Sequence, residues 1–260
     1  MFNFPYNPFI YSDLFNQECG VETSSNLIHH NPWLVYLEYF RGDSLYDIRC
    51  AGSLVDSRHV ITAAHCMTKR RFSRIVARLG EYDLETDTDC VRGICADPLL
   101  RIDVADIIVH ASYDGQDNDI AILRLKEAAP YTDFIRPICL PTRAASGNAI
   151  LSAAGWGEIP SRGYYSHLKK VLPLPFWDHQ KCMAAYPGNE IPKTVICAGG
   201  ELGIDTCRGD SGGPLTVVRE RVELAGVTSA GNIQCGEEGS PGFYTDVYLY
   251  RDWIVSVINK

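Results

Sequence analysis

The 260-residue chain is long enough for one large domain, and 46% hydrophobic residues are enough to build a sizeable core. Its 24 basic and 32 acidic residues give a formal net charge of −8, so we expect no nucleic-acid partner. No apolar run approaches the roughly 18 residues of a membrane-spanning helix, so we expect no membrane partner either.

Short apolar runs separated by turn residues follow one another along most of the chain. Residues 1–18 come before these runs, and their content of Phe, Tyr, Asn and Pro predicts a loosely attached N-terminal arm. The runs predicted as strands are Trp33–Phe40, Gly52–Thr62, Arg74–Leu79, Val104–His110, Ile120–Leu125, Leu151–Trp156, Pro214–Val218, Val222–Thr228 and Gly242–Val247. This spacing predicts an all-β sandwich or barrel.

The last predicted element is a helix. Val247, Tyr250, Ile254, Val257 and Ile258 recur at helical spacing, which predicts one amphipathic helix that packs onto the β-structure. No shift in composition marks a boundary after residue 19, so we expect one domain over residues 19–260.

The ten cysteines favour disulfides over a metal site. None of them has the C-x2-C spacing typical of zinc ligands, and an even number suits pairing. Disulfides predict an extracellular, secreted protein. The first residues have no basic segment, apolar core or cleavage site of a signal peptide, so we expect a segment upstream of this sequence.

Two segments contain residues suited to acid–base chemistry. His65 lies in Thr-Ala-Ala-His-Cys, and Asp119 lies in Asp-Asn-Asp-Ile-Ala-Ile-Leu, directly before an apolar strand. Taken alone, His65 fits a structural histidine and Asp119 a solvated turn, because a buried carboxylate is unfavourable unless a donor meets it.

A third segment changes that interpretation. Ser211 lies between glycines in Asp-Thr-Cys-Arg-Gly-Asp-Ser-Gly-Gly-Pro. Glycines allow a tight loop whose N–H groups converge on one point, which is the geometry needed to stabilise an oxyanion. Serine, histidine and aspartate together are the residue types of a base-activated oxygen nucleophile.

With these three segments in the order His, Asp, Ser, the chain resembles the chymotrypsin/trypsin family of serine endopeptidases over residues 19–260. Within that family it is most similar to the catalytic domains of arthropod clip-domain proteases. The resemblance implies an all-β fold of two packed six-stranded antiparallel barrels with a C-terminal helix. It assigns His65 as general base, Asp119 as the carboxylate that orients it, and Ser211 as nucleophile, with the N–H groups of Gly209 and Ser211 as the oxyanion hole.

The same resemblance implies specificity for Arg or Lys before the scissile bond. Asp205 matches the floor of the specificity pocket, and Ser229, Gly231 and Gly242 match its walls. An exposed loop aspartate is the alternative for Asp205. A buried carboxylate disfavours a neutral side chain that leaves its charge unpaired.

The family pattern also implies how the cysteines pair. The implied disulfides are Cys19–Cys139, Cys50–Cys66, Cys90–Cys95, Cys182–Cys197 and Cys207–Cys235.

The sequence departs from the family at the activation site. Family zymogens are cut after a basic residue, and the new Ile or Val terminus pairs with the aspartate before the catalytic serine, here Asp210. Residues 1–40 contain no Lys or Arg and no I/V-V-G-G segment. Asp210 is therefore expected to lack its ammonium partner, which leaves the chain in a zymogen-like state.

Two further positions concern ligands. Ala230 replaces a tryptophan that is usual in the family, which removes an apolar wall for residues upstream of the cleavage point. The acidic loop Glu81–Asp89 offers oxygen ligands for calcium, although a solvated acidic loop is the favoured interpretation. No other metal or cofactor is expected.

These observations predict a secreted, monomeric serine endopeptidase that acts on protein substrates, with a serpin-type inhibitor as a further possible partner class. The alternative is a non-enzymatic, protease-like binding protein held in the zymogen-like state. An acyl hydrolase is a weaker third interpretation.

Overall fold

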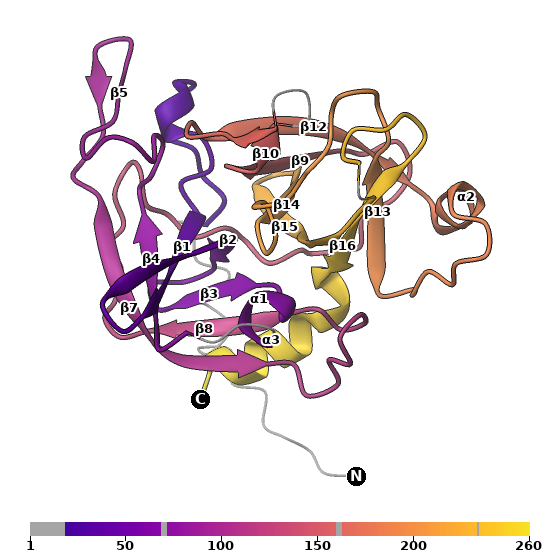
Figure 1. The fold of residues 1–260 in the computed structure, drawn as a ribbon, viewed down its shortest axis with the longest axis horizontal. Helices are drawn as coiled ribbons and strands as arrows, with labels where there is room; N and C mark the ends of the chain where they lie inside the picture. Colours follow the sequence, from indigo (N-terminus) through magenta and orange to yellow (C-terminus); the bar gives the residue numbers. More distant parts are fainter. Residues whose placement is uncertain (1–18, 69–71, 160–162, 233) are drawn as a thin grey trace.

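Two closed barrels of antiparallel strands form the computed structural model of this chain (Figure 1). The structure describes residues 19–68, 72–159, 163–232 and 234–260. The predicted arm, residues 1–18, lies outside the described residues. The two six-stranded antiparallel barrels and the C-terminal helix that the resemblance implies are confirmed.

The first barrel is built from the N-terminal half of the chain, in the strand order β1-β2-β3-β8-β7-β4. Its strands are β1 (Leu34–Arg41), β2 (Ser44–Leu54), β3 (His59–Thr62), β4 (Arg74–Leu79), β7 (Leu100–Val109) and β8 (Ala121–Leu125). All neighbouring strands pair antiparallel.

The second barrel is built from the C-terminal half, in the order β12-β13-β16-β15-β14-β9. Its strands are β9 (Ile150–Gly155), β12 (Lys170–Trp177), β13 (Val195–Gly199), β14 (Pro214–Val218), β15 (Val222–Ala230) and β16 (Pro241–Asp246).

The remaining elements are short. They are the β5/β6 pair (Cys90–Val91 and Ile94–Cys95), the β10/β11 pair (Glu158–Ile159 and Tyr164–Tyr165), α1 (His65–Thr68), α2 (His179–Ala185), α3 (Arg251–Ile258), and the 3-10 helices η1 (Leu27–His29) and η2 (Val247–Tyr250). No helix in the described ranges has the length and apolar character needed to cross a membrane.

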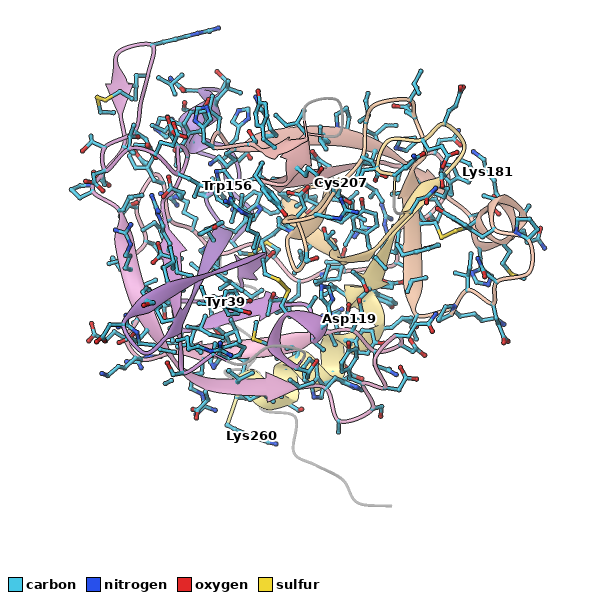
Figure 2. All side chains as sticks on the ribbon, in the orientation of Figure 1. Tyr39, Asp119, Trp156, Lys181, Cys207 and Lys260 are labelled. Atoms are coloured by element: carbon cyan, nitrogen blue, oxygen red, sulfur yellow. A yellow bond between two sulfur atoms is a disulfide. The ribbon has the colours of Figure 1, made fainter. Side chains whose placement is uncertain are left out.

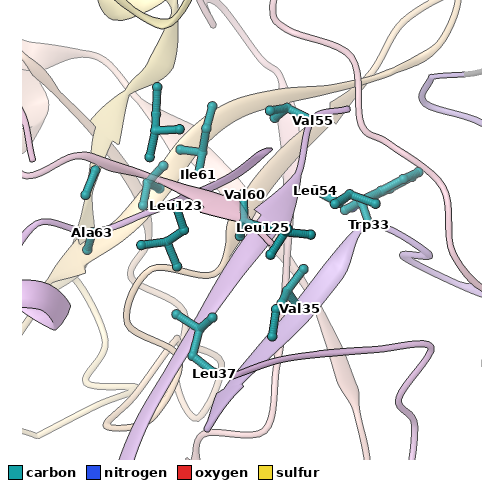
Figure 3. Packing of buried hydrophobic residues seen from close by; sticks show 14 of the residues in the cluster. Trp33, Val35, Leu37, Leu54, Val55, Val60, Ile61, Ala63, Leu123 and Leu125 are labelled. Atoms are coloured by element: carbon teal, nitrogen blue, oxygen red, sulfur yellow. The ribbon is translucent and has the colours of Figure 1, made fainter. Parts of the chain in front are cut away.

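One buried cluster fills the first barrel and reaches into the second. Leu123 and Leu125 of β8 are almost completely buried there, as is Trp33, and Figure 3 shows these side chains in the same interior. Leu224 and Val227 of β15 belong to the same cluster. Burial of a side chain of this size contributes about 1.5–3 kcal/mol, so this cluster both folds the first barrel and fixes it to the second.

The predicted C-terminal helix is confirmed, with a tighter first turn. Val247–Tyr250 forms a 3-10 helix whose start is capped by the Asp246 side chain, which accepts the Tyr248 N–H at 3.1 Å. The α-helix then buries Ile254 and Val257 in the cluster of the first barrel. The C-terminal end of the chain therefore runs from the second barrel back to the first and packs against its core.

The structure divides the predicted strand Gly52–Thr62 into β2 and β3. A side chain makes the turn between them, because the Asp56 carboxylate accepts the N–H groups of Arg58 and His59 at 2.7 and 2.8 Å. Strand β12 was not predicted, since Pro173 and Pro175 argue against a strand in a barrel wall.

Five disulfides join the described cysteines, and none of those cysteines is free. The pairs are Cys19–Cys139, Cys50–Cys66, Cys90–Cys95, Cys182–Cys197 and Cys207–Cys235. The Cys19–Cys139 bond spans 120 residues and ties the start of the described chain to the connection between the barrels.

We predict that Leu123→Ala lowers the free energy of unfolding by about 2–5 kcal/mol, because it leaves a cavity where a fully buried side chain was. The measurement is urea unfolding with the disulfides intact. Val218→Ala is the control, since Val218 is 75% exposed and its truncation should change stability by less than about 0.5 kcal/mol. Equal effects of the two substitutions would contradict the packing described above.

Candidate active site

The Asp119 carboxylate accepts hydrogen bonds from groups of both barrels. Its Oδ2 accepts the ring N–H of His65 Nδ1 at 2.7 Å, and its Oδ1 accepts the His65 backbone N–H at 2.8 Å. The hydroxyl of Ser229, near the end of β15, donates to Oδ2 at 2.5 Å. Thr245 of β16 donates to the Asp119 backbone carbonyl at 2.8 Å. Figure 2 shows Asp119 beside α1, where the two barrels meet.

These partners keep Asp119 ionised although it is 4% exposed. Burial alone raises the pKa of a carboxyl, but the hydrogen bond and charge of His65 and the Ser229 hydroxyl together hold the pKa of Asp119 below its usual value. A carboxylate accepts only, so Nδ1 of His65 must carry a proton. In the neutral ring Nε2 is therefore unprotonated and can accept a proton.

Ser211 lies close to this histidine through contacts of its neighbours. The Ala51 N–H donates to the Ser211 carbonyl at 2.8 Å. Cys50, the residue before Ala51, forms a disulfide with Cys66, the residue after His65. Cys66 Sγ is 3.8 Å from His65 Nε2. Within the described ranges no hydrogen bond joins Ser211 Oγ to the His65 ring, and such bonds are commonly long until a substrate is bound.

The loop before β14 leaves two N–H groups available. In that loop the N–H groups of Asp210, Gly212 and Gly213 donate to backbone carbonyls at 2.8–3.0 Å. Those of Gly209 and Ser211 have no acceptor among the described residues. A φ of 98° at Gly209 is a conformation that only glycine adopts readily. Two free N–H groups beside a serine hydroxyl are what a developing oxyanion needs.

Both carboxylate oxygens of Asp210 accept backbone N–H groups at this loop. Oδ1 accepts the Gly157 N–H at 2.8 Å and Oδ2 accepts the Cys207 N–H at 3.0 Å. Asp210 has no ion-pair partner in the described part of the chain. Burial therefore raises its pKa to about 6, against the two hydrogen bonds that lower it.

Asp205 lines the same cavity of about 410 Å³ as Asp210. It is buried, its Oδ2 accepts the Gly236 N–H at 3.2 Å, and its Oδ1 has no hydrogen-bond partner. Burial raises the pKa of this carboxyl, and the Gly236 N–H partly offsets the rise. A side chain on Gly242 would begin 3.3 Å from the unpartnered oxygen, whereas one on Gly231 would contact little. Neither glycine places a side chain beside the Asp205 carboxylate.

Three residues have roles that the sequence interpretation did not include. The hydroxyl of Ser229 donates its proton to Asp119, so that proton is not available to a substrate. Thr245 and Gly157 support Asp119 and Asp210 through single hydrogen bonds. A Cβ on Gly157 would lie 2.1 Å from Asp210 Oδ2, so only glycine fits there. Neither residue lies in a motif that signals its role.

The acidic loop does not present an open set of calcium ligands. Buried Glu81 pairs with the Arg78 guanidinium, and Asp89 accepts the Tyr82 N–H at 2.8 Å and the Thr86 hydroxyl at 2.5 Å. Ca²⁺ requires six to eight oxygen ligands. These two buried carboxylates already face protein donors, whereas Asp83 and Glu85 of the same loop lie beside His167.

We predict a pH-dependent loss of stability from Asp210. Folding raises its pKa from 3.8 to about 6, so the folded chain binds more protons than the unfolded chain between these values. Stability therefore falls as pH rises through this window, by on the order of 2–3 kcal/mol from this group. Asp210→Asn removes the titration.

Urea unfolding of the unaltered chain and of Asp210→Asn is measured from about pH 4 to about pH 7. The quantity compared at each pH is the difference between their free energies of unfolding. Asp246, whose pKa burial also raises to about 6, is present in both chains and cancels. A difference in unfolding free energy that does not change with pH would show that Asp210 is not an uncompensated buried carboxylate.

Comparison with known proteins gives one consistent match. The sequence matches the family model described as Trypsin over residues 21–254. It is 39% identical to Spaetzle-processing enzyme of Drosophila melanogaster, covering 86% of this chain and 62% of that protein. It is 41% identical to Serine protease ea of the same species, covering 88% of this chain and 64% of that protein.

A third relative is Phenoloxidase-activating enzyme 1 of Spodoptera litura, 37% identical over 93% of this chain and 69% of that protein. CLIP domain-containing serine protease B9 of Anopheles gambiae is 37% identical over 94% of this chain and 66% of that protein. The chain therefore spans about two thirds of the length of these curated relatives.

Proposed function

Because the chain belongs to the trypsin family of serine proteases, we propose that it hydrolyses peptide bonds after Arg or Lys through a covalent acyl-enzyme. The observation that carries this proposal is the Asp119–His65 pair beside Ser211, with the N–H groups of Gly209 and Ser211 free.

Each group has one role in the proposed reaction. Ser211 Oγ attacks the substrate carbonyl while His65 Nε2 takes its proton, and Asp119 stabilises the resulting imidazolium. The free N–H groups of Gly209 and Ser211 bind the oxyanion. His65 then protonates the leaving amine, and water hydrolyses the acyl-enzyme by the same steps.

Asp205 supports the proposed specificity. Its Oδ1 is buried without a partner, and a guanidinium or ammonium at the end of a long side chain supplies both the missing hydrogen bond and the opposite charge. An apolar side chain in the same place would leave the carboxylate unpaired.

We predict that Asp205→Ser lowers kcat/KM for an Arg substrate by at least about 100-fold relative to a matched Leu substrate, because it removes a buried charge partner. The measurement is hydrolysis of paired Arg and Leu peptide substrates by the activated chain. Glu220→Gln, an exposed charge change in the turn between β14 and β15, is the matched control. Equal turnover of the two substrates by the chain activated through a cleavable R-I-V-G-G segment would contradict Arg/Lys specificity.

We further propose that the chain is zymogen-like as it stands. Asp210 is a buried carboxylate without a cation among the described residues, and residues 19–40 contain no Lys or Arg at which an activating cut could be made. A cavity of about 410 Å³, lined by Asp210, Asp205 and Lys170 and by apolar groups such as Ala153 and Leu172, has room for an ammonium-bearing segment. Without such a cation the Asp210 carboxylate is held only by the N–H groups of Gly157 and Cys207.

The test is labelling of Ser211 with a fluorophosphonate probe in the intact chain, with Ser211→Ala as the blank. We expect slow, incomplete labelling that a trypsin-type activator does not increase. A second variant, with residues 21–31 replaced by a cleavable R-I-V-G-G segment of family length, should label rapidly after cleavage. Rapid, stoichiometric labelling of the unaltered chain would overturn the zymogen-like state while supporting the enzyme.

The setting of this activity is proposed from the covalent structure. Five disulfides persist in an oxidising compartment, so we place the protein outside the cell. Residues 19–260 act as one protease domain, preceded by the arm of residues 1–18. Its partners are protein substrates and, as a class of inhibitor, serpins, and it acts as a monomer.

A further inference from the structure

Three side chains with metal-ligating atoms meet where the acidic loop contacts the segment before β12. They are Asp83 and Glu85 of the loop and His167 of the segment, and together they are called the surface cluster below. His167 Nδ1 lies 2.9 Å from Asp83 Oδ1 and 3.9 Å from Glu85 Oε2. The three ligand atoms all lie within 4.8 Å of one another. Asp83 and His167 are 84 residues apart in the chain, so no spacing in the sequence signals the cluster.

Backbone pairing fixes the two segments that carry the surface cluster. The Leu84 N–H donates to the His167 carbonyl at 2.9 Å, and the Lys169 N–H donates to the Tyr82 carbonyl at 2.8 Å. An isolated antiparallel bridge lies between these two bonds. The side chains of the cluster therefore converge because the paired backbone places them together.

The cluster is negatively charged and has oxygen atoms available to a cation. Asp83 Oδ1 accepts the Glu85 N–H at 3.1 Å and the His167 ring N–H at 2.9 Å. Among the described residues, Asp83 Oδ2 and the Glu85 carboxylate accept no hydrogen bond. The hydrogen bond with Asp83 and the charge of Glu85 raise the pKa of His167 against the opposing charge of Lys170. The two carboxylates therefore favour positive charge at this point.

An imidazole nitrogen with two carboxylates suits zinc better than calcium. Ca²⁺ binds six to eight oxygens, whereas Zn²⁺ binds four ligands that include imidazole nitrogen and carboxylate oxygen. Tetrahedral ligands about 2.0–2.1 Å from Zn²⁺ lie about 3.3 Å from one another. The distances of 2.9 and 3.9 Å lie on either side of this value. The Glu85 side chain is exposed, so a rotation of that side chain shortens the longer distance.

The segment that carries the histidine also contacts the loop of the proposed oxyanion hole. The Ser166 N–H donates to the Gly157 carbonyl at 3.0 Å, and the Gly157 N–H donates to Asp210 Oδ1 at 2.8 Å. A Cβ on Gly209 would lie 3.0 Å from the Tyr165 ring. An ion on the surface cluster therefore ties the residues beside this loop to the acidic loop of the first barrel.

We propose that Asp83, Glu85 and His167 bind one Zn²⁺ ion, which clamps the segment before β12 to the acidic loop. His167 Nδ1 and one carboxylate oxygen from each of the other two residues are the protein ligands, and water is the fourth. The ion takes the place of the proton that Nδ1 donates to Asp83, and that proton passes to solvent. The site shares no residue with the catalytic arrangement around His65.

The first arm of the test measures Zn²⁺ binding to the intact chain by calorimetry, and we expect one ion per chain. Changing a residue that merely orients a metal ligand weakens metal affinity by about 10–100-fold. His167→Gln and Asp83→Asn alter ligands directly and should each weaken binding by at least about tenfold. Asp83→Asn keeps an acceptor for the Glu85 N–H. His179→Gln, in α2, is the matched control, and circular dichroism checks that each variant is folded.

The second arm tests the clamp through amide hydrogen exchange, measured by NMR. Zn²⁺ at ten times its measured Kd should slow exchange of the Ser166 and Gly157 N–H groups by about tenfold, because their opening separates the ligands. His167→Gln should show no such slowing. The Arg219 N–H, bonded within the turn between β14 and β15, is the control and should not respond.

His65 is the competing zinc ligand, so His65→Gln decides between the two sites. Loss of Zn²⁺ binding in His65→Gln would place the ion at the catalytic histidine and overturn the proposal. Unchanged affinity in His167→Gln, displacement of Zn²⁺ by an equal concentration of Ca²⁺, or binding without slower exchange at Ser166 would also overturn it. No measurement here uses catalysis, so the zinc site and the protease activity stand or fall separately.

Discussion

The hydrogen bonds of the Asp119 carboxylate are the interaction on which the rest of this site depends. They reach His65, at the start of α1 in the first barrel, and Ser229 at the end of β15 in the second. A carboxylate buried between two barrels is unfavourable without such donors. The same bonds therefore satisfy the buried charge, fix the histidine tautomer and hold the two barrels in register at the site.

Asp210 is the counterpart of Asp119, with the opposite electrostatic outcome. Both carboxyls are buried and both accept hydrogen bonds, but only Asp119 faces a group that can become cationic. The pKa of Asp119 is accordingly lowered, whereas burial raises the pKa of Asp210 to about 6. One carboxylate suits the proposed catalysis, and the other lines a cavity without a cation partner among the described residues.

Much of this arrangement could be predicted from the sequence, because the chemistry lies in short contiguous motifs. The segments around His65, Asp119 and Ser211 carry the resemblance, and the resemblance implied the barrels and the disulfide pairs. The match to the family model over residues 21–254 confirms the family that these segments indicated.

The rest depends on contacts between residues far apart in the chain. Strand β12 contains two prolines, so local propensity opposes it, and its pairing with β9 is what forms the strand. The Thr245 hydroxyl reaches the Asp119 carbonyl across 126 residues. Gln116, Ile191, Ala230 and Phe243 likewise come from four separate segments and line one pocket.

The most direct test of the central claim is a proton NMR spectrum of the intact chain in water at low temperature. A proton held between His65 Nδ1 and Asp119 Oδ2, 2.7 Å apart, is strongly deshielded. We predict one resonance well downfield of the amide protons that disappears in both His65→Gln and Asp119→Asn. A folded chain without that resonance, or a resonance that persists in either variant, would contradict the arrangement described here.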